Sequence, residues 1–287
     1  MNSVRPKNRD LSLDAVTTSP ILVASGEIGH FILSVVNEGE EVAGEFEVEV
    51  NGPAAWRREH DSLEPGESRD IDYVMPDMAA WRHTFEPRVI YPGDEDPLND
   101  KVSWIAVVGA LPGQVLVSEV FAAPLGDGPE WVELVNASGG DVDLSGWRIL
   151  DSRGGDGGVI GDEVVALPAG HYLMVAQDAS LFHLHNPVEQ SVMVVSLSGW
   201  PALNNGGDEV VLQDATGAVI DRMRYESTTP EKSIERVDPF GPNEDPGNCI
   251  RVLHKQGQLQ VPKTVWPGIL SMRVWNWRSP QILSRIV

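Results

Sequence analysis

The feature that most constrains the fold is a strict two-residue alternation in the first third of the chain. Residues Glu45 to Val50 read EFEVEV, which puts Phe46 and Val48 on the same face of an extended strand as Val50, and glutamates on the other face. A period of two with one charged face is typical of an antiparallel strand that is buried on one side. The segment is therefore expected to cover a core with its apolar face.

Further short runs of strand-forming residues follow one another along the chain, separated by Pro and Gly. In the first part they are His30–Val36, Ile71–Val74, Phe85–Tyr91 and Val102–Val108, and in the second part Val115–Val120, Trp131–Val135, Trp147–Leu150, Tyr172–Ala176, Val192–Val195, Glu209–Gln213 and Val219–Arg224. One helical turn is expected at Ser180–His185. Closely spaced short strands with turn signals predict an all-β protein built from β-sandwiches.

The length of 287 residues suggests about two domains. The stretch Ala110–Gly113, which reads ALPG, is a short break after which the strand pattern begins again. The predicted organisation is an N-terminal lead (1–9), a first sandwich (10–108), a linker (109–113), a second sandwich (114–248) and a tail (249–287).

The net charge of −22 bears on the class of partner. A chain this acidic repels the phosphates of nucleic acids and the head groups of anionic membranes, so neither is expected as a partner. The charge is unevenly distributed, because residues 249–287 hold six basic side chains and no acidic one. The tail therefore differs in character from the two predicted sandwiches.

Cysteine content and hydropathy limit the class of protein further. The single cysteine, Cys249, allows neither an internal disulfide nor a cysteine-based zinc site. No apolar run approaches the roughly 18 residues that a membrane span needs, so membrane insertion is not expected. The basic start of the chain lacks a following apolar segment, so no secretory signal is visible. The protein is then expected to be cytoplasmic, unless its true beginning lies upstream of Met1.

Four motifs give residues 10–108 a resemblance to the CARDB-type domain, a bacterial immunoglobulin-like module related to cell adhesion. The motifs are the opening DLSL at Asp10, the run LSVVNEG from Leu33 to Gly39, the turn LEPGES from Leu63, and the acidic loop GDEDPLND from Gly93 to Asp100. The acidic loop departs from the family pattern, because Asp100 stands where a second asparagine is usual.

Residues 114–248 resemble the lamin tail domain in its bacterial form. The motifs that carry this resemblance are VSEV from Val117, EWVELVN from Glu130, DVDLSGW from Asp141, LPAGHYL from Leu167, NGGDEVVL from Asn205 and SIER from Ser233. The two resemblances together imply two tandem immunoglobulin-like β-sandwich domains. They also imply an extracytoplasmic, secreted location in a bacterium.

The tail does not match the usual ending of bacterial lamin tail domains, and two interpretations of this difference stay open. The residues from Gly257 to Pro267 can be encoded by bases that, in another frame, give ATPGAKNSVA, which is close to the usual ending of bacterial lamin tail domains. A frame change near Gly257 would leave residues 258–287 without an evolved role, and they should then be disordered. Alternatively, the tail is genuine and its basic and aromatic side chains bind an acidic or lipid partner.

The acidic loop before the last strand of the first domain is the candidate metal site. Asp94, Asp96, Asn99 and Asp100 offer the hard oxygen ligands that suit Ca²⁺. The spacing is not that of an EF-hand, because no glycine occupies the loop centre and no glutamate closes it. The alternative is a solvated hairpin in which these side chains cap local backbone groups. No other cofactor is expected.

Two tryptophans are candidates for contact with a ligand. Trp56 follows the turn Asn51–Pro53 and stands beside Arg57 and Arg58, whereas Trp200 lies in the loop sequence SGWP. Aromatic side chains of this kind contact sugars and proteins at binding surfaces. The expected partner is a protein or a cell-surface polysaccharide.

No motif for hydrolysis, nucleotide binding or zinc-dependent proteolysis occurs in the sequence. The chain is therefore predicted not to be an enzyme, but a binding or scaffold module for adhesion or surface attachment. The alternative is an accessory region of a secreted nuclease- or phosphatase-type enzyme whose catalytic domain is not in this chain. The resemblance to lamin tail domains supports this alternative, because such domains occur beside enzymes of this type.

Overall fold

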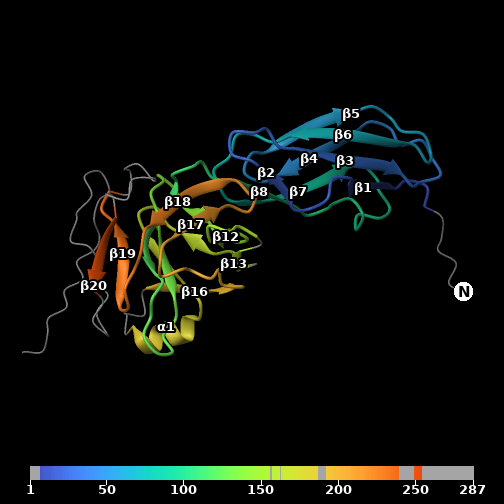
Figure 1. The fold of residues 1–287 in the computed structure, drawn as a ribbon. Helices are drawn as coiled ribbons and strands as arrows, with labels where there is room; N and C mark the ends of the chain where they lie inside the picture. The colour runs from blue at the N-terminus through green and yellow to red at the C-terminus, as the bar shows by residue number, and fades with distance from the viewer. Residues whose placement is uncertain (1–6, 156, 162, 187–191, 239–248, 254–287) are drawn as a thin grey trace, which may run out of the picture.

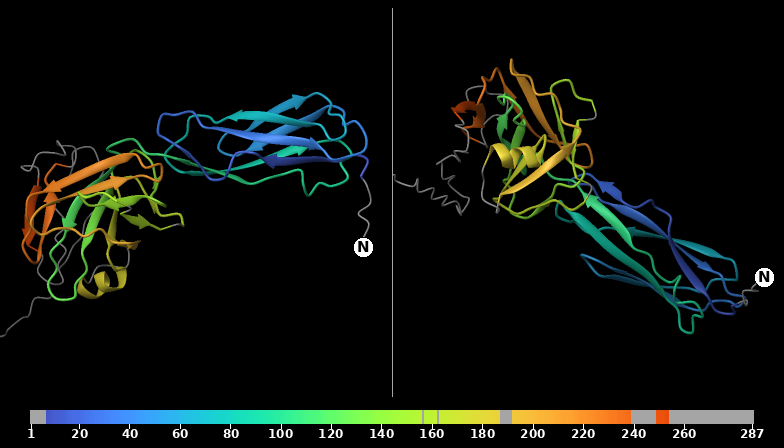
Figure 2. Two further views of the ribbon diagram at one scale, coloured as in Figure 1. Left: turned by 45° about the vertical axis from the view of Figure 1, so that its right-hand side comes forward. Right: turned by 90° about the horizontal axis from the view of Figure 1, so that it is seen from below.

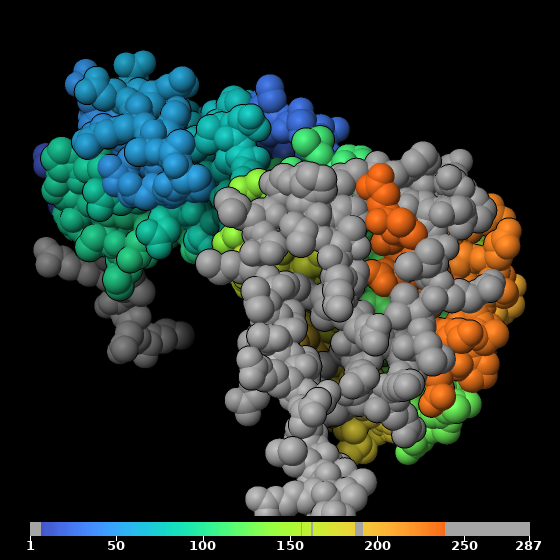
Figure 3. Space-filling model, turned by 90° about the vertical axis from the view of Figure 1, so that its left-hand side faces the viewer, coloured from blue at the N-terminus to red at the C-terminus, as the bar shows by residue number. Residues whose placement is uncertain are grey.

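The computed structural model describes residues 7–155, 157–161, 163–186, 192–238 and 249–253. Among these residues no helix is long and apolar enough to cross a membrane. The described chain forms two β domains that lie end to end (Figures 1 and 2). The space-filling view in Figure 3 shows the first domain, blue to teal, beside the second.

The first domain contains two sheets that face each other. One sheet has the order β1-β3-β6 and the other has the order β2-β8-β7-β4-β5. The strands are β1 (Leu11–Ala15), β2 (Ile21–Val23), β3 (His30–Asn37), β4 (Phe46–Asn51), β5 (Trp56–His60), β6 (Ser68–Val74), β7 (Arg82–Ile90) and β8 (Trp104–Val108). This is the sandwich predicted from the strand pattern.

The core of the first domain is built around aromatic rings. Phe31 of β3 stacks on Trp104 of β8 with ring centroids 4.0 Å apart, and both side chains are fully buried. Because these strands belong to different sheets, the contact joins the two layers. The alternation in β4 is confirmed, since Phe46 and Val48 are buried in this core.

The second domain is built on a ten-stranded sheet that closes into two layers. Its order is β18-β17-β12-β13-β16-β15-β10-β9-β19-β20, and a separate two-stranded sheet pairs β11 with β14. The elements are β9 (Val115–Phe121), β10 (Trp131–Asn136), β11 (Val142–Asp143), β12 (Arg148–Leu150), β13 (Gly158–Ile160), β14 (Ala166–Leu167), β15 (Tyr172–Ala176), α1 (Ala179–His185), β16 (Met193–Ser198), β17 (Asp208–Gln213), β18 (Val219–Tyr225), β19 (Lys232–Arg236) and β20 (Cys249–Leu253).

Strand β16 connects the two layers of this domain. Its residues Met193–Ser196 pair in parallel with β15, whereas Leu197 and Ser198 pair with β13 in the other layer. A strand that changes sheets makes a corner of a sandwich. The enclosed core includes Leu134, Trp147 and Val210. The helical turn predicted at Ser180–His185 is confirmed as α1.

A buried ion pair crosses the second core. The guanidinium of Arg236 lies 3.0 Å from the carboxylate of Asp221, and both side chains are at most 2% exposed. The carboxylate also accepts the Val117 N–H at 2.7 Å, and Arg236 donates to the Arg222 carbonyl at 2.7 Å. Burial raises the pKa of Asp221, while Arg236 opposes that shift. The pair thus ties β18, β19 and β9 together.

An asparagine has the same role at the end of a central strand in each domain. Asn37 ends β3 and Asn136 ends β10, and both are almost fully buried. Each side-chain amide donates to two backbone carbonyls, and each side-chain oxygen accepts a backbone N–H two residues further on. The asparagine in the motifs of both resemblances therefore holds the loop after its strand.

The connection between the domains is held by Asp214 in the turn between β17 and β18. One carboxylate oxygen of Asp214 accepts the Ala110 N–H at 3.0 Å. The other oxygen accepts the N–H and hydroxyl of Thr216 and the N–H of Ala218. A Cβ on Gly109 would lie 2.6 Å from the Asp214 carboxylate, so only glycine fits the approach.

The loop before β7 makes a second contact between the domains. Ala80 packs against the core cluster of the second domain. The Nε atom of Arg82 lies 3.9 Å from the buried carboxylate of Asp143. The two domains are therefore joined by a backbone clamp, an apolar contact and a charge pair.

Candidate binding site at the distal acidic end

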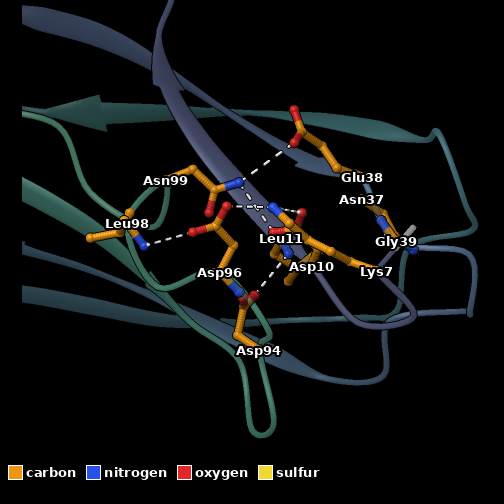
Figure 4. Close-up of polar contacts among 10 residues, drawn as sticks. All are labelled: Lys7, Asp10, Leu11, Asn37, Glu38, Gly39, Asp94, Asp96, Leu98 and Asn99. Carbon is orange, nitrogen blue, oxygen red and sulfur yellow. Dashed lines mark hydrogen bonds and ion pairs between the residues drawn. The ribbon is translucent and has the colours of Figure 1, made fainter. Parts of the chain in front are cut away.

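The predicted metal-binding loop lies at the end of the first domain that points away from the second domain (Figure 1). The loop connects β7 to β8, and the residues before β1 run alongside it. We call this surface the distal acidic end. It consists of Lys7, Asp10, Glu38, Asp94, Asp96, Asn99 and Asp100, of which Figure 4 shows all but Asp100.

Lys7 supplies the positive charge within this surface. Its ammonium group lies 2.8 Å from the carboxylate of Asp10 and also pairs with the carboxylate of Asp96. These hydrogen bonds, that to Asp10 first, raise the pKa of Lys7, and the bond to Lys7 lowers the pKa of Asp96. Two of the acidic groups at this end therefore already have a cationic partner from the chain itself.

Asp94 and Asn99 fix the shape of the loop. Asp94 accepts the backbone N–H of Leu11 at 2.8 Å and that of Asp96 at 2.7 Å. Asn99 donates to Asp10 at 3.1 Å and to Glu38 at 3.5 Å (Figure 4). Hydrogen bonds of this kind match the alternative in which the side chains cap local backbone groups.

Asp100 is a partly buried carboxyl group at this end of the domain. Burial raises its pKa to about 6, with further contributions from Asp94, Asp10 and Asp96, and Arg88 opposes the shift. One buried carboxylate oxygen of Asp100 has no hydrogen-bond donor among the described residues. The side-chain oxygen of Asn99 is in the same situation.

The structure thus brings the four predicted ligands to one end of the domain. Within the described residues, however, no group of three or more His, Cys, Asp or Glu side chains has an arrangement that could hold a metal ion. Sequence reasoning did not include Lys7, whose contact with Asp96 joins residues 89 positions apart. The Ca²⁺ site stays a prediction.

Trp56 begins the edge strand β5 and is half-buried. Its ring meets Tyr73 of the core edge to face with centroids 5.6 Å apart. The guanidinium carbon of Arg58 lies 5.3 Å from the Trp56 ring centroid. The indole therefore has an aromatic and a cationic neighbour within its own domain, and its role in ligand contact stays a prediction.

Trp200 lies far from Trp56, in the second domain, and packs partly against its core. Its indole N–H donates to the carboxylate of Glu130 at 2.6 Å. Burial raises the pKa of Glu130, and the bond from Trp200 opposes that shift. The structure does not bring Trp56 and Trp200 together, so they do not form one site.

Residues 110–227 match the family model of the Lamin Tail Domain, which confirms the resemblance stated for the second domain. No curated protein matches the chain. Among solved structures, the CARDB domain of the PF1109 protein from Pyrococcus furiosus matches twice. The solution structure is 14% identical, covers 36% of this chain and 97% of its own, and has a TM-score of 0.31. The crystal structure, in complex with di-metal ions, is 14% identical, covers 37% and 94%, and has a TM-score of 0.33.

The family model that matches the second domain is the one that its sequence motifs indicated. A third similar structure, CBD12 from CALX1.2, is 12% identical, covers 73% of this chain and 80% of its own, and has a TM-score of 0.26. The lamin tail match indicates a non-catalytic β-sandwich module.

Proposed function

We propose that this chain, whose residues 110–227 match the lamin tail domain, is a tandem binding and scaffold module for surface attachment outside the cytoplasm of a bacterium. The first domain would present its distal acidic end to a protein or a cell-surface polysaccharide. The second domain would serve as the base that holds the first domain at a fixed distance.

The observation that carries this proposal is the clamped connection between the domains. Asp214 accepts the backbone N–H of Ala110, and Gly109 allows the Asp214 carboxylate to approach the connecting segment closely. The connection is thus held by a buried hydrogen bond to Asp214 rather than left as a free linker. A fixed connection supports a scaffold role, because it keeps the far end of one domain at a constant position relative to the other.

Ca²⁺ is the cation that we propose for the distal acidic end. Carboxylate and amide oxygens are its preferred ligands, and Asn99 and Asp100 each have one such oxygen without a donor in the described structure. Because the ammonium of Lys7 lies between Asp10 and Asp96, Ca²⁺ would have to displace it. Calorimetric titration of the full chain with CaCl₂ should therefore show tighter binding for Lys7→Met than for the wild type. No heat in either protein, with melting unaffected by EDTA, would exclude the site.

Attachment itself is tested with beads that carry the full chain through a C-terminal tag, so that the distal acidic end faces outward. The beads are incubated with bacterial envelope fragments and with purified cell-wall polysaccharide, and the bound fraction is counted. We expect attachment by the wild type and a clear loss in Glu38→Gln/Asp100→Asn. The matched control, Glu45→Gln/Glu59→Gln, changes the same charge at exposed positions elsewhere on the domain.

Equal attachment by both variants would show that the distal acidic end is not the contact surface. Absence of attachment to any surface would contradict the adhesion role. The accessory role would then be favoured if a nuclease- or phosphatase-type domain adjoins this chain in its gene and the chain binds that enzyme.

A further inference from the structure

The first domain has one side where the edge strands of its two sheets lie next to each other. Strand β5 ends the five-stranded sheet and β6 ends the three-stranded sheet, and neither pairs with a further strand among the described residues. The two strands lie side by side in Figure 1, and Trp56 of β5 contacts Tyr73 of β6. The outer peptide groups of β5 are therefore available to a strand from a partner.

Alternate side chains of β5 point toward β6 at the margin of the core. In the pairing of β5 with β4, Trp56, Arg58 and His60 are opposite residues that are buried in the core. Directly opposed residues on adjacent strands share a face, so these three side chains lie on the core side of their sheet. Arg69 of β6 is likewise opposite buried Val35. We call Trp56, Arg58, His60 and Arg69 the edge cluster.

The edge cluster brings basic groups together in a domain that is otherwise acidic. The guanidinium of Arg58 lies over the Trp56 ring, whereas the ion pairs that β5 makes to glutamates of β4 use Arg57. The Nε2 atom of His60 is buried and has no hydrogen-bond partner among the described residues. Burial lowers the pKa of His60, Arg69 and Arg58 lower it further, and Asp61 opposes them. The imidazole is therefore near two guanidinium groups.

The edge cluster has the chemistry to bind carboxylates on an extended peptide. A guanidinium that stacks on an aromatic ring is held in place for hydrogen bonds to a carboxylate. Every second side chain of a strand lies on the same face, about 6.8 Å from the last, which is also the spacing of Arg58 and His60 along β5. A peptide that pairs with the edge of β5 gains backbone hydrogen bonds that a polysaccharide cannot supply in this regular order. The position of Arg58 over Trp56 also leaves less of that ring for a sugar to stack on.

We propose that an acidic segment of a partner protein adds to β5 as an extended strand and places its carboxylates against Arg58 and His60. This surface shares no residue with the distal acidic end, so it is a second contact surface of the first domain. The rest of the domain carries mostly acidic side chains, which repel the same segment. Charge complementarity therefore directs the segment to the edge cluster.

Binding of a labelled synthetic peptide to the full chain, measured by fluorescence anisotropy, tests this proposal. The probe is a peptide of four Glu-Thr repeats, in which all glutamates share one face of an extended strand. We expect the wild type to bind it and Arg58→Gln to bind it about tenfold more weakly, because a charge-assisted hydrogen bond is lost. Arg58 is exposed, so its replacement should leave the fold intact. The matched control, Arg57→Gln, removes the same charge from the opposite face of β5 and should change the affinity less than about twofold.

Two further probes separate a peptide strand from other anions. The same peptide with N-methylated backbone amides keeps its charges but cannot pair with β5, and it should bind about tenfold more weakly. Polygalacturonate carries carboxylates without a peptide backbone and should compete poorly. No binding of the Glu-Thr peptide by the wild type, or equal binding by Arg58→Gln, would overturn the proposal. Polygalacturonate that competes as well as the peptide would overturn the assignment to a protein partner.

Discussion

Replacing Asp100 by asparagine should stabilise the first domain at neutral pH. The pKa of Asp100 is raised from 3.8 to about 6 by burial and by Asp94, Asp10 and Asp96. A rise in pKa from 3.8 to about 6 corresponds to roughly 3 kcal/mol of unfavourable free energy for the ionised group. Because the side chain is partly exposed, screening by solvent reduces the expected gain to about 1–2 kcal/mol.

The sign of the effect follows from proton binding. Between about pH 3.8 and pH 6 the folded state retains a proton on Asp100 that the unfolded state has lost, so stability falls as pH rises through this window. Above about pH 6 the full penalty is present, and below about pH 3.8 it is absent. Asp100→Asn removes the ionisable group, so its advantage over the wild type should be small near pH 4 and largest near pH 7.5.

Differential scanning calorimetry of the full chain at these two pH values measures the effect. For a domain of this size, a gain of about 1–2 kcal/mol should raise Tm by about 5–10 °C near pH 7.5. Glu95→Gln is the matched control, because Glu95 is exposed in the same loop and its replacement should leave Tm almost unchanged. The reasoning is refuted if Asp100→Asn has the same effect at both pH values, or if it lowers Tm near pH 7.5.

Three further substitutions test other parts of the structure. Asp214→Asn keeps one oxygen for its turn but places an amide group opposite the Ala110 N–H. We expect the free energy of unfolding in urea to fall by about 2 kcal/mol, and the distance distribution between the domains, measured by pulsed electron paramagnetic resonance, to broaden. An unchanged distribution would contradict the role of Asp214 in fixing the connection. Asn136→Ala removes three hydrogen bonds to backbone groups and should cost about 3 kcal/mol, whereas a cost near zero would mean that solvent replaces them. Arg236→Met leaves the Asp221 carboxylate buried without its cation and should lower the free energy of unfolding by about 3–5 kcal/mol. Adding Asp221→Asn to the same chain should recover part of this loss. A double variant less stable than Arg236→Met alone would refute this account.

The parts of the fold that the sequence predicts are those with a strong local pattern. The alternation of EFEVEV gives the buried face of β4 directly, and the apolar run of Tyr172–Ala176 gives β15 with its bounds. Strand β5 was not predicted, because WRREH has one aromatic residue and three charges. It is an edge strand whose side chains are mostly solvated, so hydrophobic periodicity cannot reveal it.

In the candidate sites, too, contacts within one loop were predictable from the sequence and contacts between distant segments were not. Asp94, Asp96, Asn99 and Asp100 come from one loop, so their proximity follows from the sequence alone. The pairing of Lys7 with Asp96 was not predictable, because it depends on how β1 and the loop after β7 are placed in the fold. The proximity of Glu119, Glu133 and Glu235 was not predictable for a similar reason.

Nothing local in the sequence marks these three glutamates as neighbours, because they are separated by 14 and 102 positions along the chain. Glu119, Glu133 and Glu235 become neighbours only through the register of β10, β9 and β19. In each strand taken alone, a single glutamate among apolar residues suggests a solvated position. The burial of all three side chains is a property of the assembled sheet.

The central claim is that the connection between the domains is fixed. The most direct test is the distance distribution between spin labels on Glu45→Cys and Ser152→Cys, both at exposed positions in different domains, with Cys249→Ser as background. A single narrow distribution is expected, because Asp214, Gly109 and the Arg82–Asp143 pair hold the domains together. A broad distribution, as given by a free linker, would contradict the account and remove the support for a scaffold role.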